Sequence, residues 1–89
     1  MIEQTFTIIN KLGLHARAAA KFVNMASQFE SEIQVTRNGR AVNGKSIMGL
    51  MMLAAAKDTE ISVSADGADA KQAMQDIEAL INDFFGEGE

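Results

Sequence analysis

Apolar and polar residues alternate along four short segments of the chain, and this period of two predicts strands with one buried face. The segments are residues 2–9, 32–36, 41–42 and 60–66. An Asn-Gly dipeptide at positions 38–39 joins the second and third segments, and its tolerance of positive φ angles favours a type I′ hairpin turn. We therefore expect four strands, two of which form a hairpin.

Apolar residues three or four positions apart predict three helices. The first runs from about residue 16 to 27, a short second from 47 to 53, and a long third begins near residue 70. The buried stripes of the two longer helices are expected to consist of Ala19, Phe22, Val23 and Ala26 in the first, and of Ala70, Ala73, Met74, Ile77, Leu80, Ile81 and Phe84 in the third.

Polar residues stand where two of these helices begin. Ser46 precedes the second helix and is a favoured N-cap residue. Asp69 and Gln72 have the spacing of a capping box at the start of the third helix. After that helix, residues 86–89 are expected to be a frayed tail.

The elements follow the order βαββαβα. Helices that alternate with strands in this way need a sheet face to cover, which predicts a two-layer α/β sandwich of the α+β kind. The chain has 89 residues without proline or low-complexity sequence, which is enough for one core. We therefore expect a single domain over residues 1–89.

The composition argues against several classes of function. With no cysteine and one histidine, a disulfide framework, thiol chemistry and a zinc or iron site are not expected. No charged segment followed by an apolar run opens the chain, and the longest apolar stretch, residues 47–56, is far too short to span a membrane. We expect a cytoplasmic protein that needs no metal or other cofactor.

The net charge of −4 is unevenly distributed along the chain. Residues 1–57 carry seven basic and three acidic side chains, whereas residues 58–89 carry one basic and nine acidic ones. The first part should therefore present a mildly electropositive face that attracts an acidic partner or a phosphorylated donor. Nucleic acid is not expected as a partner, because the chain is acidic overall and its five Phe do not lie among the basic residues.

The only histidine, His15, lies between a glycine turn and the start of the first expected helix. The first turn of a helix presents N–H groups without intrahelical partners at the positive end of the helix dipole, and such a place attracts anions. Arg17 adds a guanidinium group that can bind a phosphate. An imidazole nucleophile in this setting suits a phosphoryl group carried on nitrogen. The alternative is a histidine that only caps the helix.

Two segments together resemble HPr, the histidine-containing phosphocarrier family of the phosphoenolpyruvate-dependent phosphotransferase system. They are Gly-Leu-His-Ala-Arg at positions 13–17 and Gly-Lys-Ser-Ile-Met-Gly-Leu at positions 44–50. The resemblance covers nearly the whole chain and includes the order of the elements. It implies an open-faced sandwich in which three helices cover one face of a four-stranded antiparallel sheet. The nitrogen-branch paralogue NPr belongs to the same family, so the choice between sugar transport and nitrogen regulation stays open.

The resemblance implies that enzyme I phosphorylates His15 with phosphoenolpyruvate as the source, and that the phosphoryl group passes on to IIA proteins or domains. The N–H groups of Ala16 and Arg17, with the Arg17 side chain, are the candidates for holding the phosphate. Such a protein is a stoichiometric carrier rather than a turnover enzyme, and we expect a monomer. The chain departs from the family at Ala18, where proline is usual, so the first turn of the helix is expected to be less rigid here.

For Ser46, the resemblance implies a regulatory role besides that of a helix cap. In bacteria that have HPr kinase/phosphorylase, the family is phosphorylated by that enzyme at this serine. The alternative function is therefore a regulatory binding module controlled by Ser46 phosphorylation, as in Crh-like relatives that lack the active histidine. The presence of both His15 and Arg17 argues against regulation as the sole role.

The second helix is apolar on nearly every side. One interpretation is a short helix that is buried all round. The other is an exposed Met-rich patch that docks several partners, which suits a carrier and which the family resemblance implies. On that interpretation, Ile47, Met48 and Met51 form the docking surface, while Leu50 and Leu53 are buried.

Overall fold

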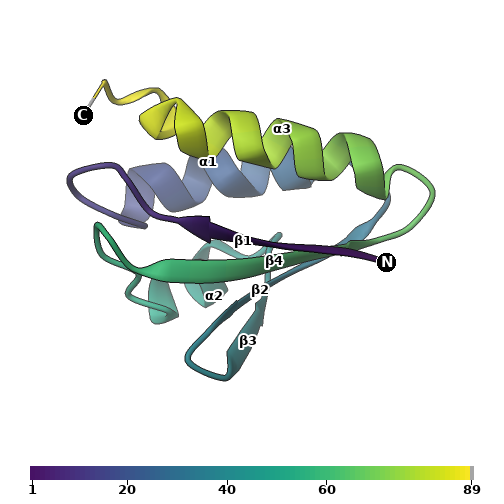
Figure 1. The fold of residues 1–89 in the computed structure, drawn as a ribbon, viewed down its shortest axis with the longest axis horizontal. Helices are drawn as coiled ribbons and strands as arrows, with labels where there is room; N and C mark the ends of the chain where they lie inside the picture. The colour runs from purple at the N-terminus through teal and green to yellow at the C-terminus, as the bar shows by residue number, and fades with distance from the viewer. Residues whose placement is uncertain (89) are drawn as a thin grey trace.

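The computed structural model describes residues 1–88, and its helices and strands follow the expected order (Figure 1). In chain order they are β1 (Ile2–Thr7), α1 (Ala16–Ala26), β2 (Glu32–Arg37), β3 (Arg40–Asn43), α2 (Ile47–Met52), β4 (Glu60–Asp66), α3 (Ala70–Asn82) and the 3₁₀ turn η1 (Phe84–Gly86). The order βαββαβα is confirmed, and the observed ends lie within two residues of those that the periodicity predicts.

The four strands form one antiparallel sheet in the order β1-β4-β2-β3. β4 lies between β1 and β2, and Phe6 of β1 stands opposite Ile61 of β4. In the hairpin between β2 and β3, Asn38 and Gly39 have φ angles of 51° and 79°. Positive φ at both central residues is what a type I′ turn requires, so the predicted hairpin is confirmed.

One face of the sheet is covered by helices and the other is open. α1 and α3 lie side by side over the covered face (Figure 1), and α2 packs against α1 and β3. The residues of β4 alternate accordingly, because Ile61, Val63 and Ala65 are buried whereas Ser62 and Ser64 are only half-buried. The fold is the two-layer, open-faced α/β sandwich expected from the sequence.

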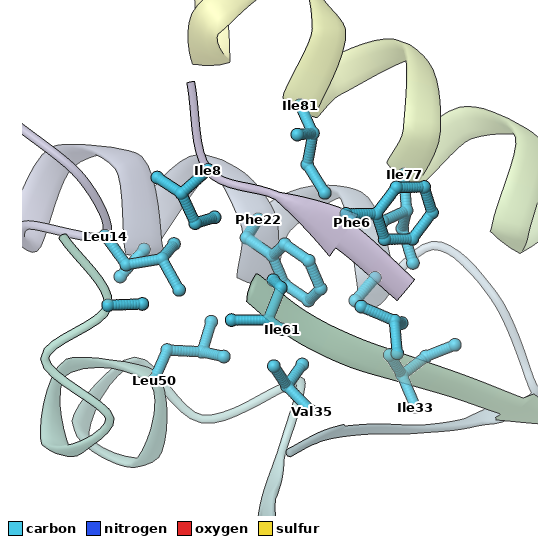
Figure 2. Packing of buried hydrophobic residues seen from close by; sticks show 14 of the residues in the cluster. Phe6, Ile8, Leu14, Phe22, Ile33, Val35, Leu50, Ile61, Ile77 and Ile81 are labelled. Atoms are coloured by element: carbon cyan, nitrogen blue, oxygen red, sulfur yellow. The ribbon is translucent and has the colours of Figure 1, made fainter. Parts of the chain in front are cut away.

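The apolar core lies between the sheet and the helices, as Figure 2 shows. Phe22 of α1, Ile61 of β4 and Ile77 of α3 are buried there. Leu50 of α2 and Leu14, which directly precedes His15, enter the same core. Full burial of one such side chain stabilises a fold by roughly 1.5–3 kcal/mol, so the start of α1 is firmly anchored.

The predicted capping box at the start of α3 is wrong. Asp69 is the N-cap residue, but its side chain makes no bond to the first turn of the helix. The carboxylate instead accepts hydrogen bonds from the N–H groups of Glu30 and Ser31 and from the Ser31 hydroxyl. The Gln72 side chain donates to Asp76. Ser31 is completely buried, so its N–H and hydroxyl donors need an acceptor within the protein. The Asp69 carboxylate therefore bonds to Ser31 instead of capping α3.

The predicted frayed tail is wrong for Gly86 and Glu87. Beyond Asn82, both Phe84 and Phe85 have positive φ angles, 57° and 53°, and the chain turns toward α1. Phe85 is completely buried and Phe84 only half-buried, although the helical period assigns Phe84 to the apolar stripe. The apolar stripe of α3 does not extend to Phe84 because the helix ends at Asn82. Burial of the Phe85 side chain offsets the backbone strain of the two residues with left-handed φ angles. Glu87 is largely buried, and Glu89 lies outside the described residues.

Within residues 1–88, no helix has the length and apolar character needed to cross a bilayer. In the same part of the chain, no three His, Asp or Glu side chains are grouped so that they could hold a metal ion.

Candidate functional site

His15 is the N-cap residue of α1. Its backbone is extended, with φ −77° and ψ 179°, and its Nδ1 atom accepts a hydrogen bond of 3.3 Å from the backbone N–H of Arg17. The Nδ1 lone pair therefore points at the start of the helix, where free N–H groups and the helix dipole favour an anion. This is the placement that the sequence predicts.

The loop after α2 fixes the loop that carries His15. Leu14 is buried in the core, and its N–H donates to the carbonyl oxygen of Ala55 at 2.9 Å. Gly13 has a φ of +68°, and a Cβ atom at this position would collide with the same carbonyl oxygen. Glycine is required here both for the left-handed backbone and for the close approach of the two loops.

The other ring nitrogen of His15 contacts a residue that the sequence analysis missed. Nε2 lies 2.5 Å from Oε2 of Glu87, and Oε1 of the same carboxylate accepts a 3.0 Å hydrogen bond from Nδ2 of Asn10. Asn10 is completely buried, and its amide also donates to the carbonyl oxygen of Gly13 at 2.8 Å. The exposed fraction is 28% for the His15 side chain and 12% for Glu87. The imidazole is thus held at both nitrogens.

The surroundings of Glu87 favour its ionised form. Burial raises the pKa of the carboxyl group, but hydrogen bonds from Asn10 and His15 outweigh it together with the positive charge of Lys21 and, when its ring is protonated, that of His15. The pKa of Glu87 therefore lies below its ordinary value of 4.5. Because an ionised carboxylate only accepts hydrogen bonds, the proton shared with His15 belongs to Nε2.

Cationic side chains gather around Glu87, the residue that contacts Nε2 of His15. A shallow hollow of about 300 Å³ is lined by Lys11, Leu12, Arg17, Lys21, Gly86 and Glu87. This concentration of positive charge suits a phosphate group. Among these cationic residues, only Arg17 was predicted from the sequence to belong to the site. Lys21 stands four positions after Arg17, a spacing that places both on one face of a helix, and that signal could have identified it.

The residues predicted to hold the phosphate lie in the first turn of α1. Ala16 and Arg17 are its first two residues, and both are exposed. Ala18, where the HPr family usually has proline, follows them and is completely buried. The first turn thus places two exposed residues next to Nδ1 of His15 on a backbone anchored in the core, and the N–H of Arg17 already bonds to that nitrogen.

Ser46 caps α2, as the sequence predicts. Its hydroxyl oxygen accepts a 3.0 Å hydrogen bond from the N–H of Gly49. The side chain is therefore at the N-terminus of α2, on an element that packs against α1.

The surface of α2 is apolar and exposed on one side. Met48 is 72% exposed, and Ile47, Met51 and Met52 are also exposed; we call these four residues the α2 patch. Leu50 and Leu53 are buried, as expected from the sequence. The interpretation of α2 as a helix buried all round is therefore wrong, and Met52 extends the exposed set that the sequence analysis selected.

Comparisons with known proteins agree with this geometry. The chain matches the family model described as "PTS HPr component phosphorylation site" over residues 2–83. It is 63% identical to the phosphocarrier protein HPr of Neisseria meningitidis over 89 residues, and 52% identical to that of Cupriavidus necator, with 100% of both chains covered in each case. Among solved structures, HPr-C-His from Thermoanaerobacter tengcongensis has a TM-score of 0.94 and 46% identity, covering 98% of each chain.

The fold, the histidine at the start of α1 and these matches together place the chain in the class of phosphocarrier proteins. The chain belongs to the HPr family of the phosphotransferase system. The resemblance carried by the two sequence segments is thereby confirmed.

Proposed function

We propose that the chain carries a phosphoryl group on His15. It accepts the group from enzyme I, which is itself phosphorylated by phosphoenolpyruvate, and delivers it to IIA proteins or domains. The observation that supports this most is the position of Nδ1 of His15 at the start of α1, next to the N–H of Arg17. Membership of the HPr family supports the choice of partners.

Nδ1 is the reacting nitrogen in this proposal. Nε2 is engaged by the Glu87 carboxylate, whereas Nδ1 has a long hydrogen bond of 3.3 Å from a backbone N–H. A phosphoryl group on Nδ1 would bring its oxygens to the N–H groups of Ala16 and Arg17. The helix end can therefore stabilise the phosphate without rearrangement of α1.

In the charging step, the Nδ1 lone pair forms a bond to phosphorus. The bond between phosphorus and the donor atom of enzyme I breaks, and its electron pair stays with the donor. Such transfers pass through a loose transition state, so catalysis consists of positioning and charge stabilisation. The guanidinium of Arg17 and the ammonium groups of Lys11 and Lys21 supply positive charge from this chain. The protein acts as a stoichiometric carrier rather than a turnover enzyme.

The α2 patch is the proposed docking surface for both partners. Its Ile47, Met48 and Met51 side chains are exposed on a helix that packs against α1, which carries the histidine. Methionine side chains are flexible and polarisable, so one patch can fit several unrelated surfaces. We propose that the protein works as a monomer in the cytoplasm, because a carrier must present one small face to successive partners.

A second, regulatory function is proposed for Ser46 in bacteria that contain HPr kinase/phosphorylase. The Ser46 hydroxyl lies at the N-terminus of α2 beside the α2 patch. A phosphoserine there would gain favourable interaction with the helix dipole, so the fold would persist while acidic partners are repelled. Incubation with that kinase and ATP should add an acid-stable phosphoryl group that Ser46→Ala lacks. Absence of this group in the wild type would contradict the regulatory role.

An intact-mass measurement tests the carrier function. Wild type and His15→Ala are incubated with enzyme I and phosphoenolpyruvate, and part of each sample is then treated briefly with acid. We expect one phosphoryl group on the wild type only, and its loss in acid, as for a phosphoryl group on nitrogen. If the same enzyme I charges another HPr protein but leaves this wild type unmodified, the proposal is contradicted.

A further inference from the structure

The segment after α3 folds over the start of α1 and brings a carboxylate to the histidine. Phe85 is buried in the core, and its carbonyl oxygen accepts a 2.7 Å hydrogen bond from Nζ of Lys21. Two residues later, Glu87 reaches Nε2 of His15, which is 72 positions away in the sequence. Because Phe85 anchors the segment, Glu87 occupies a defined position at the site.

A buried amide orients the Glu87 carboxylate. Asn10 donates from Nδ2 both to Oε1 of Glu87 and to the carbonyl oxygen of Gly13. The reverse orientation of this amide would place its oxygen against two acceptor oxygens, so the chemistry of the neighbours fixes it. With Oε1 bound to Asn10, Oε2 faces the imidazole ring.

The contacts of the two ring nitrogens of His15 agree on one tautomer. Nδ1 accepts a hydrogen bond from the N–H of Arg17, so it carries no proton. Nε2 faces the Glu87 carboxylate, which can only accept, so it carries the proton of the neutral ring.

We propose that Glu87 is a positioning residue for phosphoryl transfer: it holds the ring proton on Nε2 and thereby keeps the Nδ1 lone pair of His15 available for phosphorus. This inference rests on the proposed carrier function and assigns a role to a side chain outside the two sequence segments that carry the family resemblance.

The proton on Nε2 matters in both directions of transfer. During charging, Nδ1 forms its bond to phosphorus while the donor keeps the electron pair of the broken bond, and the ring gains positive charge that the Glu87 carboxylate stabilises through Nε2–H. During discharge, the N–P bond breaks and its electron pair returns to Nδ1. Because Nε2 retains its proton, the leaving group is a neutral imidazole instead of an imidazolide anion.

The negative charge of Glu87 is compatible with a phosphate site. Lys11, Arg17 and Lys21 line the same hollow, so positive side chains outnumber this carboxylate. The carboxylate also faces Nε2, which leaves the ring between it and a phosphoryl group on Nδ1.

Rapid-quench kinetics test this role on the full chain. Charging by phosphorylated enzyme I and discharge to a IIA protein are timed for wild type, Glu87→Gln, Glu87→Ala and Glu87→Asp. Asp83→Asn is the matched control, because Asp83 is an exposed carboxylate at the end of α3, outside the site. We expect Glu87→Gln and Glu87→Ala to slow both steps by about 10- to 100-fold, the loss seen when the outer partner of a metal-ligating histidine is removed. Glu87→Asp should recover part of the rate, and Asp83→Asn should match the wild type.

Long-range ¹H–¹⁵N NMR correlations of the neutral His15 ring supply a readout that a merely structural tail would not change. The wild type should show the proton on Nε2, and Glu87→Ala should show an increased share on Nδ1, with thermal unfolding confirming that both proteins are folded. Unchanged rates in Glu87→Gln, a faster Glu87→Ala or an unchanged tautomer would overturn the inference and leave the carrier function standing. Failure of the wild type itself to be charged would overturn the carrier function and this inference with it.

Discussion

The ammonium group of Lys21 lies 2.7 Å from the carbonyl oxygen of Phe85 and donates a hydrogen bond to it. This bond joins the middle of α1 to the segment that follows α3, in which Glu87 lies two residues further on and contacts His15.

Replacement of Lys21 by Met should loosen the tail while keeping most of the apolar stem of the side chain. We expect the free energy of unfolding to fall by about 1.5–3 kcal/mol, the usual net contribution of a hydrogen bond that involves a charged group. Amide hydrogen exchange at Gly86 and Glu87 should become faster than in the wild type, while exchange in β4 is unchanged. Equal exchange rates at both residues would show that the bond does not hold the tail.

The two neighbouring phenylalanines should differ sharply in their effect on stability. Phe85 is completely buried, so Phe85→Ala should lower the free energy of unfolding by about 3–5 kcal/mol through the cavity it leaves. Phe84 is half-buried, so Phe84→Ala should lower the free energy of unfolding by only about 1 kcal/mol. Urea unfolding of the two variants under the same conditions makes the comparison, and the reverse order would contradict the observed turn after α3.

A charge in the α2 patch should slow transfer without changing the fold. Met48→Glu places a carboxylate where the side chain is 72% exposed, and we expect charging by enzyme I to slow by about tenfold, which corresponds to about 1.4 kcal/mol.

The matched control is Gln75→Glu, which adds the same charge at an exposed position of α3. It should be charged at the wild-type rate, and both variants should unfold like the wild type. If Met48→Glu is charged as fast as Gln75→Glu, Met48 is not part of the docking surface.

The Asp69 carboxylate should make stability depend on pH in the acidic range. The hydrogen bond from the Ser31 hydroxyl, followed by the one from the Glu30 N–H, holds the pKa of Asp69 below its ordinary value of 3.8. Because the folded protein binds this proton less readily than the unfolded chain, the stabilisation is present above pH 3.8 and is lost as the pH falls through the lower folded pKa. Wild type should therefore be more stable than Asp69→Ala at neutral pH, and the difference should shrink in acid. A difference that stays constant during acid titration would contradict the assignment.

Local periodicity was sufficient for most of the fold. The alternation in β4 and the helical stripe around Phe22 depend on neighbours a few residues away. The alternation is observed as predicted, and in the stripe Ala19, Phe22 and Ala26 are buried whereas Val23 is half-buried. The hairpin followed from the backbone preference of Asn38 and Gly39. These features need no knowledge of distant parts of the chain.

The wrong predictions concern side chains whose partners lie far away in the sequence. Asp69 has the spacing of a capping box, but its carboxylate accepts hydrogen bonds from the buried Ser31, which is 38 positions away, instead of from the first turn of α3. Glu87 looks like part of a polar tail until Phe85 is seen to be buried. No local pattern links Glu87 to His15, so half of the histidine's environment could not be read from the sequence.

The most direct test of the account is to locate the phosphoryl group on the charged, ¹⁵N-labelled protein by ³¹P and ¹⁵N NMR. We predict one phosphorus nucleus coupled to Nδ1 of His15, with a proton retained on Nε2. A phosphoryl group on Nε2 or on any other residue would contradict the account, because the structure directs Nδ1 to the start of α1 and engages Nε2 with Glu87.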